Sequence, residues 1–209
     1  MSTLLVVNSS PFHETSVSRH LSEEFVQNWK QSNPNGKVIT RDLTSSNLKT
    51  IDAAWVGASY TPKDARTEEQ KQALEVSETL LGELRAADEY VFGVPMHNFS
   101  IPSVLKLWID QIARVGETFS YADGVPKGLL QGKKATFLVA SGGAYDAGTV
   151  MASFNHVEPY LRSVFGFLGV ADAKFLSAGG ASALMYGKVD RATFLQPHVE
   201  AIRSQFVAA

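Results

Sequence analysis

The chain has 209 residues, and 44% of them are hydrophobic, which is enough to close one sizeable core. Its 19 Lys and Arg residues against 21 Asp and Glu residues give a net charge of -2, which favours neither nucleic acid as a partner nor a chain kept unfolded by self-repulsion. Because the chain has no cysteine, it cannot form a disulfide, a thiolate zinc site or an iron–sulfur cluster, and any redox chemistry requires a bound cofactor. We expect residues 1–209 to form a single domain.

The N-terminal sequence does not have the pattern of a signal peptide. Only four apolar residues, Leu4 to Val7, precede the polar Asn8, and no positively charged region comes before them. No apolar run in the sequence approaches the ~18–20 residues that are needed to span a bilayer. We therefore expect a cytoplasmic protein without a membrane partner.

Short apolar runs and amphipathic stretches alternate along the chain. Residues 4–7 form an apolar run that ends in turn-forming residues, which predicts a strand buried on both faces. Apolar residues then recur every three or four positions from Ser16 to about Asn33, which predicts an amphipathic helix. The same patterns predict further strands at 37–43, 90–94, 135–140 and 171–176 and further helices at 66–86, 102–112, 159–167 and 188–207. Five strands alternating with helices predict a parallel α/β sheet covered on both faces.

Two segments are longer than such a sheet needs, residues 55–64 and residues 115–130. The second segment contains Phe119 and Tyr121. It is interpreted either as a hairpin or flap near a binding site, or as a surface excursion that packs its own aromatic side chains.

The loop after the first strand is the first candidate site, because open parallel sheets bind ligands beyond the carboxyl ends of their strands. This loop carries five hydroxyl side chains near the start of the first helix: Ser9, Ser10, Thr15, Ser16 and Ser18. Hydroxyl donors and free amides at the positive end of a helix dipole predict a phosphate-binding loop without glycines. The alternative is an ordinary helix N-cap, for which serine and threonine are favoured.

Other nucleotide-binding and hydrolase motifs do not occur in the sequence. No G-x-G-x-x-G follows the first strand, so a Rossmann-type NAD site is not indicated. The segment from Gly128 to Lys134 has one residue too few between its glycines for a P-loop, and no Ser or Thr follows its first lysine. Neither G-x-S-x-G nor H-E-x-x-H is present.

The loops after the third and fourth strands suit a planar ring. Residues Pro95 to Pro102 place apolar side chains, an imidazole and an amide between two prolines. Gly142 and Gly143 allow the main chain to approach a ligand closely. Each loop alone is equally explained as a turn. Together with the phosphate-binding loop they predict one ligand that consists of a phosphate, a linker and a planar ring.

These residues resemble the FMN-dependent NADH azoreductases, also called FMN-dependent NADH:quinone oxidoreductases. The resemblance is carried by Asn8-Ser9-Ser10, Ser16-Val17-Ser18, Pro95-Met96-His97-Asn98-Phe99-Ser100-Ile101-Pro102, Leu105-Lys106, Ala113-Arg114, Gly116, Thr118-Phe119, Gly132-Lys133-Lys134 and Gly142-Gly143. It implies a flavodoxin-like three-layer sandwich with strand order 2-1-3-4-5, and a homodimer whose two FMN sites lie at the subunit interface. It also implies that NADH or NADPH transfers hydride to flavin N5. The flavin then reduces a quinone by two electrons, or cleaves an azo compound, in ping-pong order.

The resemblance further implies the roles of individual residues. The FMN phosphate is expected at Ser10, Ser16, Val17 and Ser18. The isoalloxazine and its N5 side are expected at Pro95, Met96, His97, Asn98 and Phe99, and the pyrimidine end at Ala140, Ser141, Gly142 and Gly143. Phe119 and Tyr121 are expected to stack on nicotinamide or quinone. Because the flavin supplies the difficult chemistry, no side chain is expected to be an obligatory acid or base, and no metal is expected.

Two positions depart from the family's pattern. Histidine stands at 97, where relatives often have tyrosine, and Ala140-Ser141 stands where they often have Ser-Arg. The missing arginine would remove a positive charge near the ring and so alter the flavin potential and the acceptor preference. An unperturbed imidazole titrates at about pH 6.5, so His97 would add a pH dependence near neutrality.

Two other functions fit parts of this pattern. A non-catalytic flavodoxin-like electron carrier would share the fold, but such carriers use acidic surfaces to steer docking, whereas this chain is nearly neutral. A phosphate-ester hydrolase would use the same phosphate-binding loop, but the sequence offers neither a cysteine nucleophile nor a paired carboxylate–metal motif.

Overall fold

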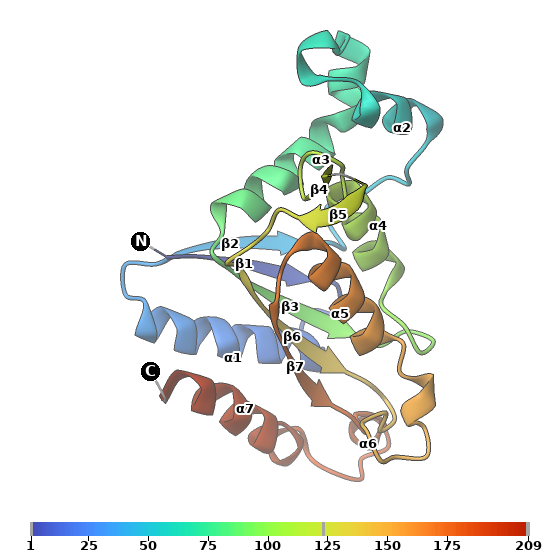
Figure 1. Cartoon of the computed structure of the whole chain (residues 1–209). Coiled ribbons are helices and arrows are strands. Elements are labelled where there is room, and N and C mark those ends of the chain that lie inside the picture. Colours follow the sequence, from blue (N-terminus) through green and yellow to red (C-terminus); the bar gives the residue numbers. More distant parts are fainter. Residues whose placement is uncertain (1, 123, 208–209) are drawn as a thin grey trace.

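A twisted parallel sheet lies between two layers of helices in the computed structural model, which describes residues 2–122 and 124–207 (Figure 1). The sheet has five strands in the order β2-β1-β3-β6-β7, and every neighbouring pair is parallel. The strands are β1 (Thr3–Asn8), β2 (Lys37–Asp42), β3 (Glu89–Pro95), β6 (Lys134–Ala140) and β7 (Asp172–Ala178). Counted within the sheet, this is the order 2-1-3-4-5, so the expected flavodoxin-like sandwich is confirmed.

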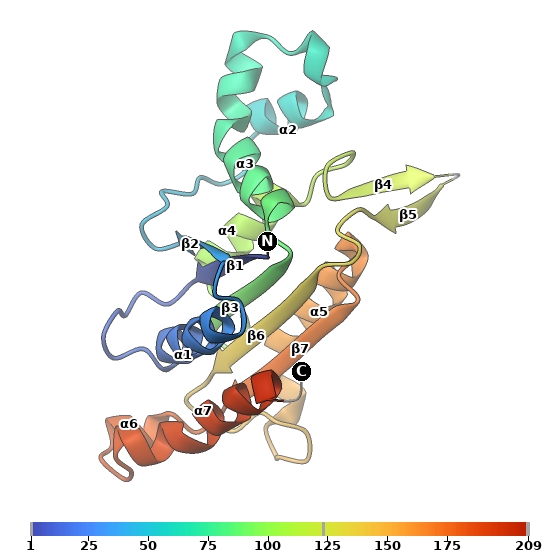
Figure 2. The ribbon, with the colours of Figure 1, turned by 90° about the vertical axis from the view of Figure 1, so that its left-hand side faces the viewer.

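Each strand contributes side chains to a core on both sides of the sheet. One face is covered by α1 and α7, and the other by α3, α4 and α5 (Figure 2). Their bounds are α1 (Val17–Ser32), α3 (Glu68–Ala86), α4 (Ser103–Ile112), α5 (Val157–Leu168) and α7 (Arg191–Val207). Leu4 and Val6 of β1 pack toward α1 and α7, whereas Leu5 and Val7 pack toward the opposite layer. Burial on both faces explains why the central strands β1, β3 and β6 are nearly continuous apolar runs.

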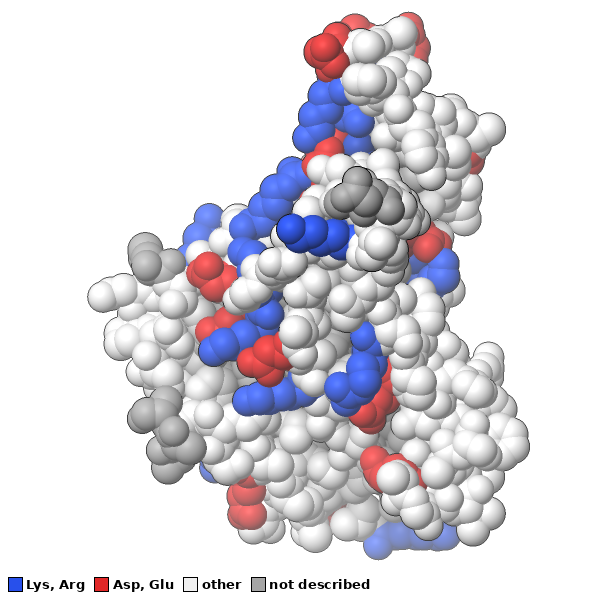
Figure 3. Space-filling model, viewed as in Figure 1, with Lys and Arg blue, Asp and Glu red and all other residues white. Residues whose placement is uncertain are grey.

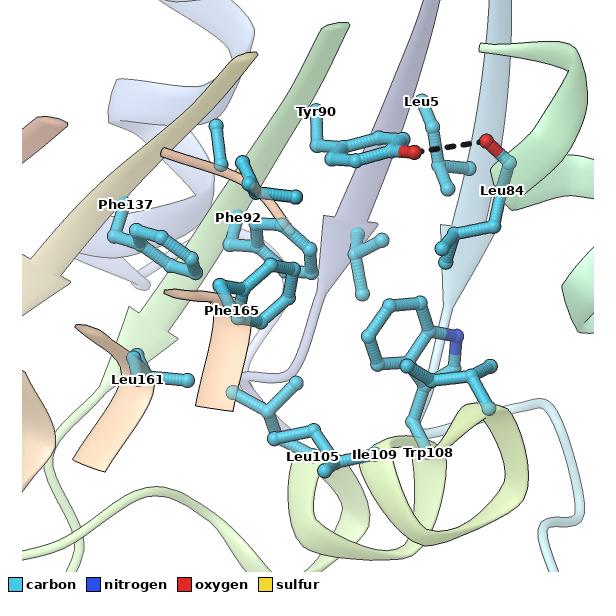
Figure 4. Close-up of a cluster of buried hydrophobic side chains, with 14 of the residues drawn as sticks. Leu5, Leu84, Tyr90, Phe92, Leu105, Trp108, Ile109, Phe137, Leu161 and Phe165 are labelled. Carbon is cyan, nitrogen blue, oxygen red and sulfur yellow. Dashed lines mark hydrogen bonds between the residues drawn. The ribbon is translucent and has the colours of Figure 1, made fainter. Parts of the chain in front are cut away.

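Aromatic side chains fill the larger of the two cores (Figure 4). Phe92 of β3 stacks on Phe137 of β6 at a centroid distance of 4.8 Å and meets Phe165 of α5 edge-on at 5.0 Å. Tyr90 donates a hydrogen bond from its hydroxyl to the carbonyl of Leu84 at 2.9 Å, and burial raises the pKa of this phenol. The buried hydroxyl is therefore neutral and paired, and the packed aromatics hold the strands that carry the candidate loops.

The first of the two extra segments contains helices that the sequence did not predict. Residues 55–64 lie mostly within α2 (Ala53–Tyr60) and the 3-10 turn η1 (Lys63–Ala65), which project beside the outer end of α3 (Figure 1). Trp55 is buried in a small separate cluster with Ala58 and Leu74. Its ring nitrogen donates to Gln111 Oε1 at 2.8 Å, which ties α2 to α4.

The second extra segment, residues 115–130, forms an antiparallel hairpin, as one interpretation expected. Its Phe119 and Tyr121 rings pack edge to face at 5.8 Å, as the alternative of a surface excursion expected. Its strands are β4 (Phe119–Ala122) and β5 (Val125–Gly128). The end of the hairpin touches the end of α5, where the amide of Leu130 donates to the carbonyl of Leu168 at 2.9 Å.

Several boundaries also differ from the sequence-based ones. Helix α5 begins at 157 rather than 159, β7 runs over 172–178 rather than 171–176, and α7 begins at 191 rather than 188. Two short turns were not predicted: η2 (Ala152–Phe154) before α5 and α6 (Ser182–Met185) before α7. Helix α3 begins at 68 because Thr67 and Gln70 form a reciprocal capping box. No helix in the described ranges is long and apolar enough to cross a bilayer.

Candidate functional site

The three predicted loops lie along one edge of the sheet, because they leave the carboxyl ends of the neighbouring strands β1, β3 and β6. Backbone contacts join them directly. The amide and the hydroxyl of Ser9 both donate to the carbonyl of Gly93, at 3.1 and 2.9 Å. The amide of Met96 donates to the carbonyl of Ala140 at 2.7 Å. The structure thus gathers the three loops at the edge where open parallel sheets bind ligands.

Ser16 and Ser18 meet at the start of α1. Ser16 is the N-cap: its hydroxyl accepts a hydrogen bond from the amide of Arg19 at 3.2 Å and lies 3.3 Å from the hydroxyl of Ser18. The N-cap interpretation is therefore confirmed for Ser16. Ser18 is fully buried, so its hydroxyl contacts Ser16 instead of lying at the surface. Ser10 is also buried, and its hydroxyl accepts from the amide of Phe12 at 3.3 Å.

The first amides of α1 have no acceptor. Val17 and Ser18 are both buried, and none of the hydrogen bonds within residues 2–122 and 124–207 uses their N–H groups. The first turn of every helix leaves such amides unpaired, and burial makes an unpaired amide costly. An anion at this helix start would satisfy them and would interact favourably with the helix dipole.

Two arginines donate hydrogen bonds to backbone carbonyls of the same loop, and the sequence analysis did not single them out. Arg19 is buried, and its Nε and Nη2 donate to the carbonyl of Ser10 at 3.1 and 2.6 Å. Arg191, the first residue of α7, donates to the carbonyls of Thr15 and Ser16 at 2.8 and 3.0 Å. Sequence spacing gives no signal for Arg191, because 175 residues separate it from Ser16.

Asp42, at the end of β2, fixes the position of Arg19. Its carboxylate lies 2.8 Å from Arg19 Nη2. Burial alone would raise the pKa of Asp42, but hydrogen bonds from Arg19 and Thr44 outweigh burial and lower the pKa from 3.8 to about 2. The carboxylate is therefore ionised at neutral pH, and the guanidinium stays paired behind the loop.

The loop after β3 contains a strained turn. The amides of His97 and Ser100 each donate to the other residue's carbonyl, at 2.9 and 3.0 Å. Between them Asn98 and Phe99 have φ values of 47° and 71°, in the left-handed region that costs a residue with a side chain roughly 1–2 kcal/mol. Strain of this kind is retained mainly where a functional geometry requires it. The exposed imidazole of His97 and amide of Asn98 are thereby held on a rigid backbone.

Aromatic packing connects this turn to the loop after β6. The ring of Phe99 lies 6.1 Å from the ring of Tyr145 and 5.2 Å from that of Phe154. The carbonyl of Phe99 also accepts from the amide of His156 at 3.0 Å, just before α5. Tyr145 and Phe154 therefore support the turn through Phe99, and the sequence analysis did not single them out.

The loop after β6 leaves open space at Gly142. The hydroxyl of Ser141 donates to the carbonyl of Gly143 at 2.8 Å, and the carbonyl of Gly142 accepts from the amide of Ser182 at 3.1 Å. A Cβ built on Gly142 would meet only the Cβ of Ser182, at 3.9 Å. Packing within the chain therefore does not require glycine here, and a side chain would occupy space that a ligand could use.

Phe119 and Tyr121 do not join these loops within one chain. Phe119 packs against Phe167, near the last residue of α5, at a centroid distance of 4.8 Å. The strained turn contacts His156, just before α5. His156 and Phe167 are eleven positions apart, which corresponds to roughly 16 Å along a helix. Within one chain, the structure therefore does not bring Phe119 to the strained turn, where the sequence analysis expects the ring.

Comparisons with known proteins decide the family. The family model of the flavodoxin-like fold matches residues 2–206. An FMN-dependent NADH:quinone oxidoreductase of Acidobacterium capsulatum is 56% identical over 203 residues, which cover 97% of this chain and 98% of that protein. The chain belongs to the FMN-dependent NADH:quinone oxidoreductase family.

Further relatives of this family match nearly the full chain. FMN-dependent NADH:quinone oxidoreductase 3 of Burkholderia lata is 47% identical over 206 residues, covering 99% of this chain and 100% of that protein. Among solved structures, an azoreductase from Bacillus anthracis superposes with a TM-score of 0.87 at 28% identity, covering 99% of each chain. An FMN-dependent NADH-azoreductase from Bacillus anthracis, in complex with FMN, also superposes with a TM-score of 0.87, at 27% identity, covering 100% of this chain and 99% of that chain.

Proposed function

We propose that residues 1–209 form a single FMN-binding domain and that the protein is an oxidoreductase. It would use NADH or NADPH to reduce quinones by two electrons and to cleave azo compounds reductively. The observation that carries this proposal is that the unpaired amides at the start of α1 lie on the same edge of the sheet as the loops after β3 and β6. The close relatives named for the same cofactor, reductant and quinone activity support it.

The residues present fit the phosphate end of FMN. The amides of the buried residues Val17 and Ser18 have no acceptor among the described residues, and the N-cap hydroxyl of Ser16 lies 3.3 Å from the hydroxyl of Ser18. These groups are donors that a phosphate accepts from. Arg19 and Arg191 lie behind the loop and add positive charge without occupying its donors. Ser10, Ser16, Val17 and Ser18 would hold the phosphate.

The other two loops fit the ring of FMN. Pro95, Met96, His97, Asn98 and Phe99 would border the isoalloxazine, and Ala140, Ser141, Gly142 and Gly143 would approach its pyrimidine end. The open space at Gly142 and the fixed turn at 97–100 support this assignment. Backbone amides of these loops would stabilise negative charge on the pyrimidine end.

FMN, when bound, would supply the redox chemistry, taking hydride at N5 and passing two electrons to the acceptor in ping-pong order. The chain would bind and orient the ring and the substrates. No side chain is required as an acid or base. The exposed side chain of His97 would lie beside the ring on a backbone that the strained turn holds fixed.

We further propose a cytoplasmic homodimer whose two sites lie at the subunit interface. Apolar side chains next to the three loops are exposed in the single chain, including Phe12 (65%), Val150 (96%) and Met185 (83%). Exposed apolar groups that adjoin a site are typical of a covered surface. In such a dimer, the hairpin with Phe119 and Tyr121 of one subunit would lie beside the substrate in the site of the other subunit. Light scattering on the purified protein measures the oligomeric state directly.

A non-catalytic electron carrier is the alternative. The face in Figure 3 has Lys and Arg atoms interspersed with Asp and Glu atoms, with a basic stretch along α3, instead of one acidic field. This distribution does not favour the electrostatic docking on which such carriers depend. Steady-state oxidation of NADH in the presence of benzoquinone would exclude the carrier.

The cofactor is tested first by the absorbance of the purified protein. Flavin bands are expected, and denaturation should release FMN and not FAD. The Ser16→Ala/Ser18→Ala double variant should retain less FMN, whereas Ser163→Ala, on the exposed side of α5, is the matched control. Full retention of FMN by the double variant would show that the start of α1 does not hold the phosphate.

A further inference from the structure

We infer that Arg191 is a positioning residue that holds the carbonyls of Thr15 and Ser16 and so directs the amides of Ser16 and Val17 at the FMN phosphate, while Arg19 fixes the other end of the loop. This inference rests on the proposed function, because it assumes that the loop binds that phosphate. The two side chains grip opposite ends of the loop, Arg19 at Ser10 and Arg191 at Thr15 and Ser16.

A side chain that holds a backbone carbonyl also orients the amide in the same peptide plane. In a trans peptide the C=O and the N–H point in opposite directions. The carbonyl of Thr15 shares its peptide plane with the amide of Ser16, and the carbonyl of Ser16 shares its plane with the amide of Val17. By donating to both carbonyls, at 2.8 and 3.0 Å, Arg191 directs these two amides away from itself. The Val17 amide is one of the two unpaired amides in the first turn of α1, and the Ser16 amide precedes it at the N-cap.

Arg19 fixes the other end of the loop. Its two contacts with the carbonyl of Ser10 hold the plane of the Ser10–Pro11 peptide, which has no N–H of its own. The Asp42 carboxylate at 2.8 Å keeps the guanidinium in place. Because Arg19 also belongs to α1 and its amide donates to Ser16, one residue ties the start of the loop to the helix cap.

A planar guanidinium is needed at Arg191 in particular. Its Nη1 and Nη2 donate to two successive carbonyls at once. The guanidinium of arginine holds its donors in a fixed plane and can do this, whereas the ammonium of lysine is a single point charge. A simple docking role is assigned instead to Arg203 on the same helix, which is exposed and pairs with Glu24 of α1 at 3.4 Å. Arg203 therefore provides a matched control: it has the same charge, the same helix and a contact with α1 but not with the loop.

The test compares two ligands that differ only in the phosphate. Apoprotein of the full chain is titrated with FMN and with riboflavin, and each Kd is measured by flavin fluorescence at fixed ionic strength. For Arg191→Gln we expect the Kd for FMN to rise about tenfold, about 1.4 kcal/mol, while the Kd for riboflavin stays within about twofold. Arg191→Lys should behave like Arg191→Gln although it keeps the charge, and Arg203→Gln should behave like wild type with both ligands.

Several results would overturn the inference. If Arg191→Lys binds FMN as wild type does, charge and not the carbonyl grip is what matters. If both ligands weaken in parallel, Arg191 only supports the fold, and if neither weakens it has no part in binding. A wild-type protein that binds FMN no better than riboflavin would refute the proposed phosphate site itself. Failure of the clamp alone leaves the wild-type preference for FMN intact.

Discussion

At Gly93 the chain of β3 lies close against α1, and its substitution by alanine should damage both the fold and the proposed cofactor site. A Cβ at this residue would lie 2.6 Å from Asn8 Oδ1, 2.6 Å from the Ser22 hydroxyl and 3.0 Å from the carbonyl of Ser18. The Ser22 hydroxyl is itself bonded to that carbonyl at 2.9 Å, so the collision is with a fixed part of α1. Relief therefore requires the helix to move away from β3. Overpacking of this kind costs typically 1–3 kcal/mol, and we expect about 2 kcal/mol for Gly93→Ala.

Urea unfolding measures this loss. With a slope of about 2 kcal/mol per molar urea, the midpoint of Gly93→Ala should fall by about 1 M. Because α1 begins at the proposed phosphate site, the Kd for FMN should rise as well. Gly82→Ala is the control: a Cβ there meets nothing within 4 Å. Alanine in a helix interior is favoured over glycine by about 0.5–1 kcal/mol, so this variant should be slightly more stable.

A second substitution separates the collision from other causes. Ser22→Ala removes one of the two atoms at 2.6 Å, so Gly93→Ala/Ser22→Ala should regain part of the lost stability. Gly93→Ala unfolding at the wild-type midpoint would refute the reasoning, since it would mean that α1 is not in contact with β3 at this point.

Three further outcomes are expected. Asp42→Asn should cost on the order of 1 kcal/mol at pH 7. Because the fold lowers the pKa of Asp42 from 3.8 to about 2, the carboxylate adds to the free energy of unfolding above about pH 5, and this stabilisation is lost as the pH falls toward 2. The urea midpoints of Asp42→Asn and wild type should therefore converge over that range. Gly128→Ala places a Cβ 2.2 Å from the amide nitrogen of Gly169, so limited proteolysis should cut the hairpin faster than in the control Gly166→Ala, whose Cβ meets nothing. His97→Tyr should change the KM for the quinone in NADH oxidation without changing FMN retention, because the exposed side chain of His97 lies on the turn proposed to border the ring; an unchanged KM would remove His97 from the site.

Local sequence patterns predicted the central strands because burial on both faces leaves continuous apolar runs. They predicted most helices because one buried face leaves apolar residues three or four positions apart. The same patterns failed at α2, whose sequence Ala-Ala-Trp-Val-Gly-Ala-Ser-Tyr has no distinct polar face. They failed again at α6, which has only four residues. Helix ends were shifted where a side chain decided them, as at Thr67 with its capping box.

The chain order of the residues determined that hydroxyls, a histidine–amide turn and two glycines would follow three strands of a parallel sheet, and this was enough to place them on one edge. It did not reveal that Ser18 is buried against Ser16, that Asn98 and Phe99 adopt left-handed conformations, or that Phe119 lies far from the loops of its own chain. Those facts depend on contacts between distant segments. The grip of Arg191 on Thr15 and Ser16 is the clearest instance, because only the packing of the last helix against the first brings the guanidinium to those carbonyls.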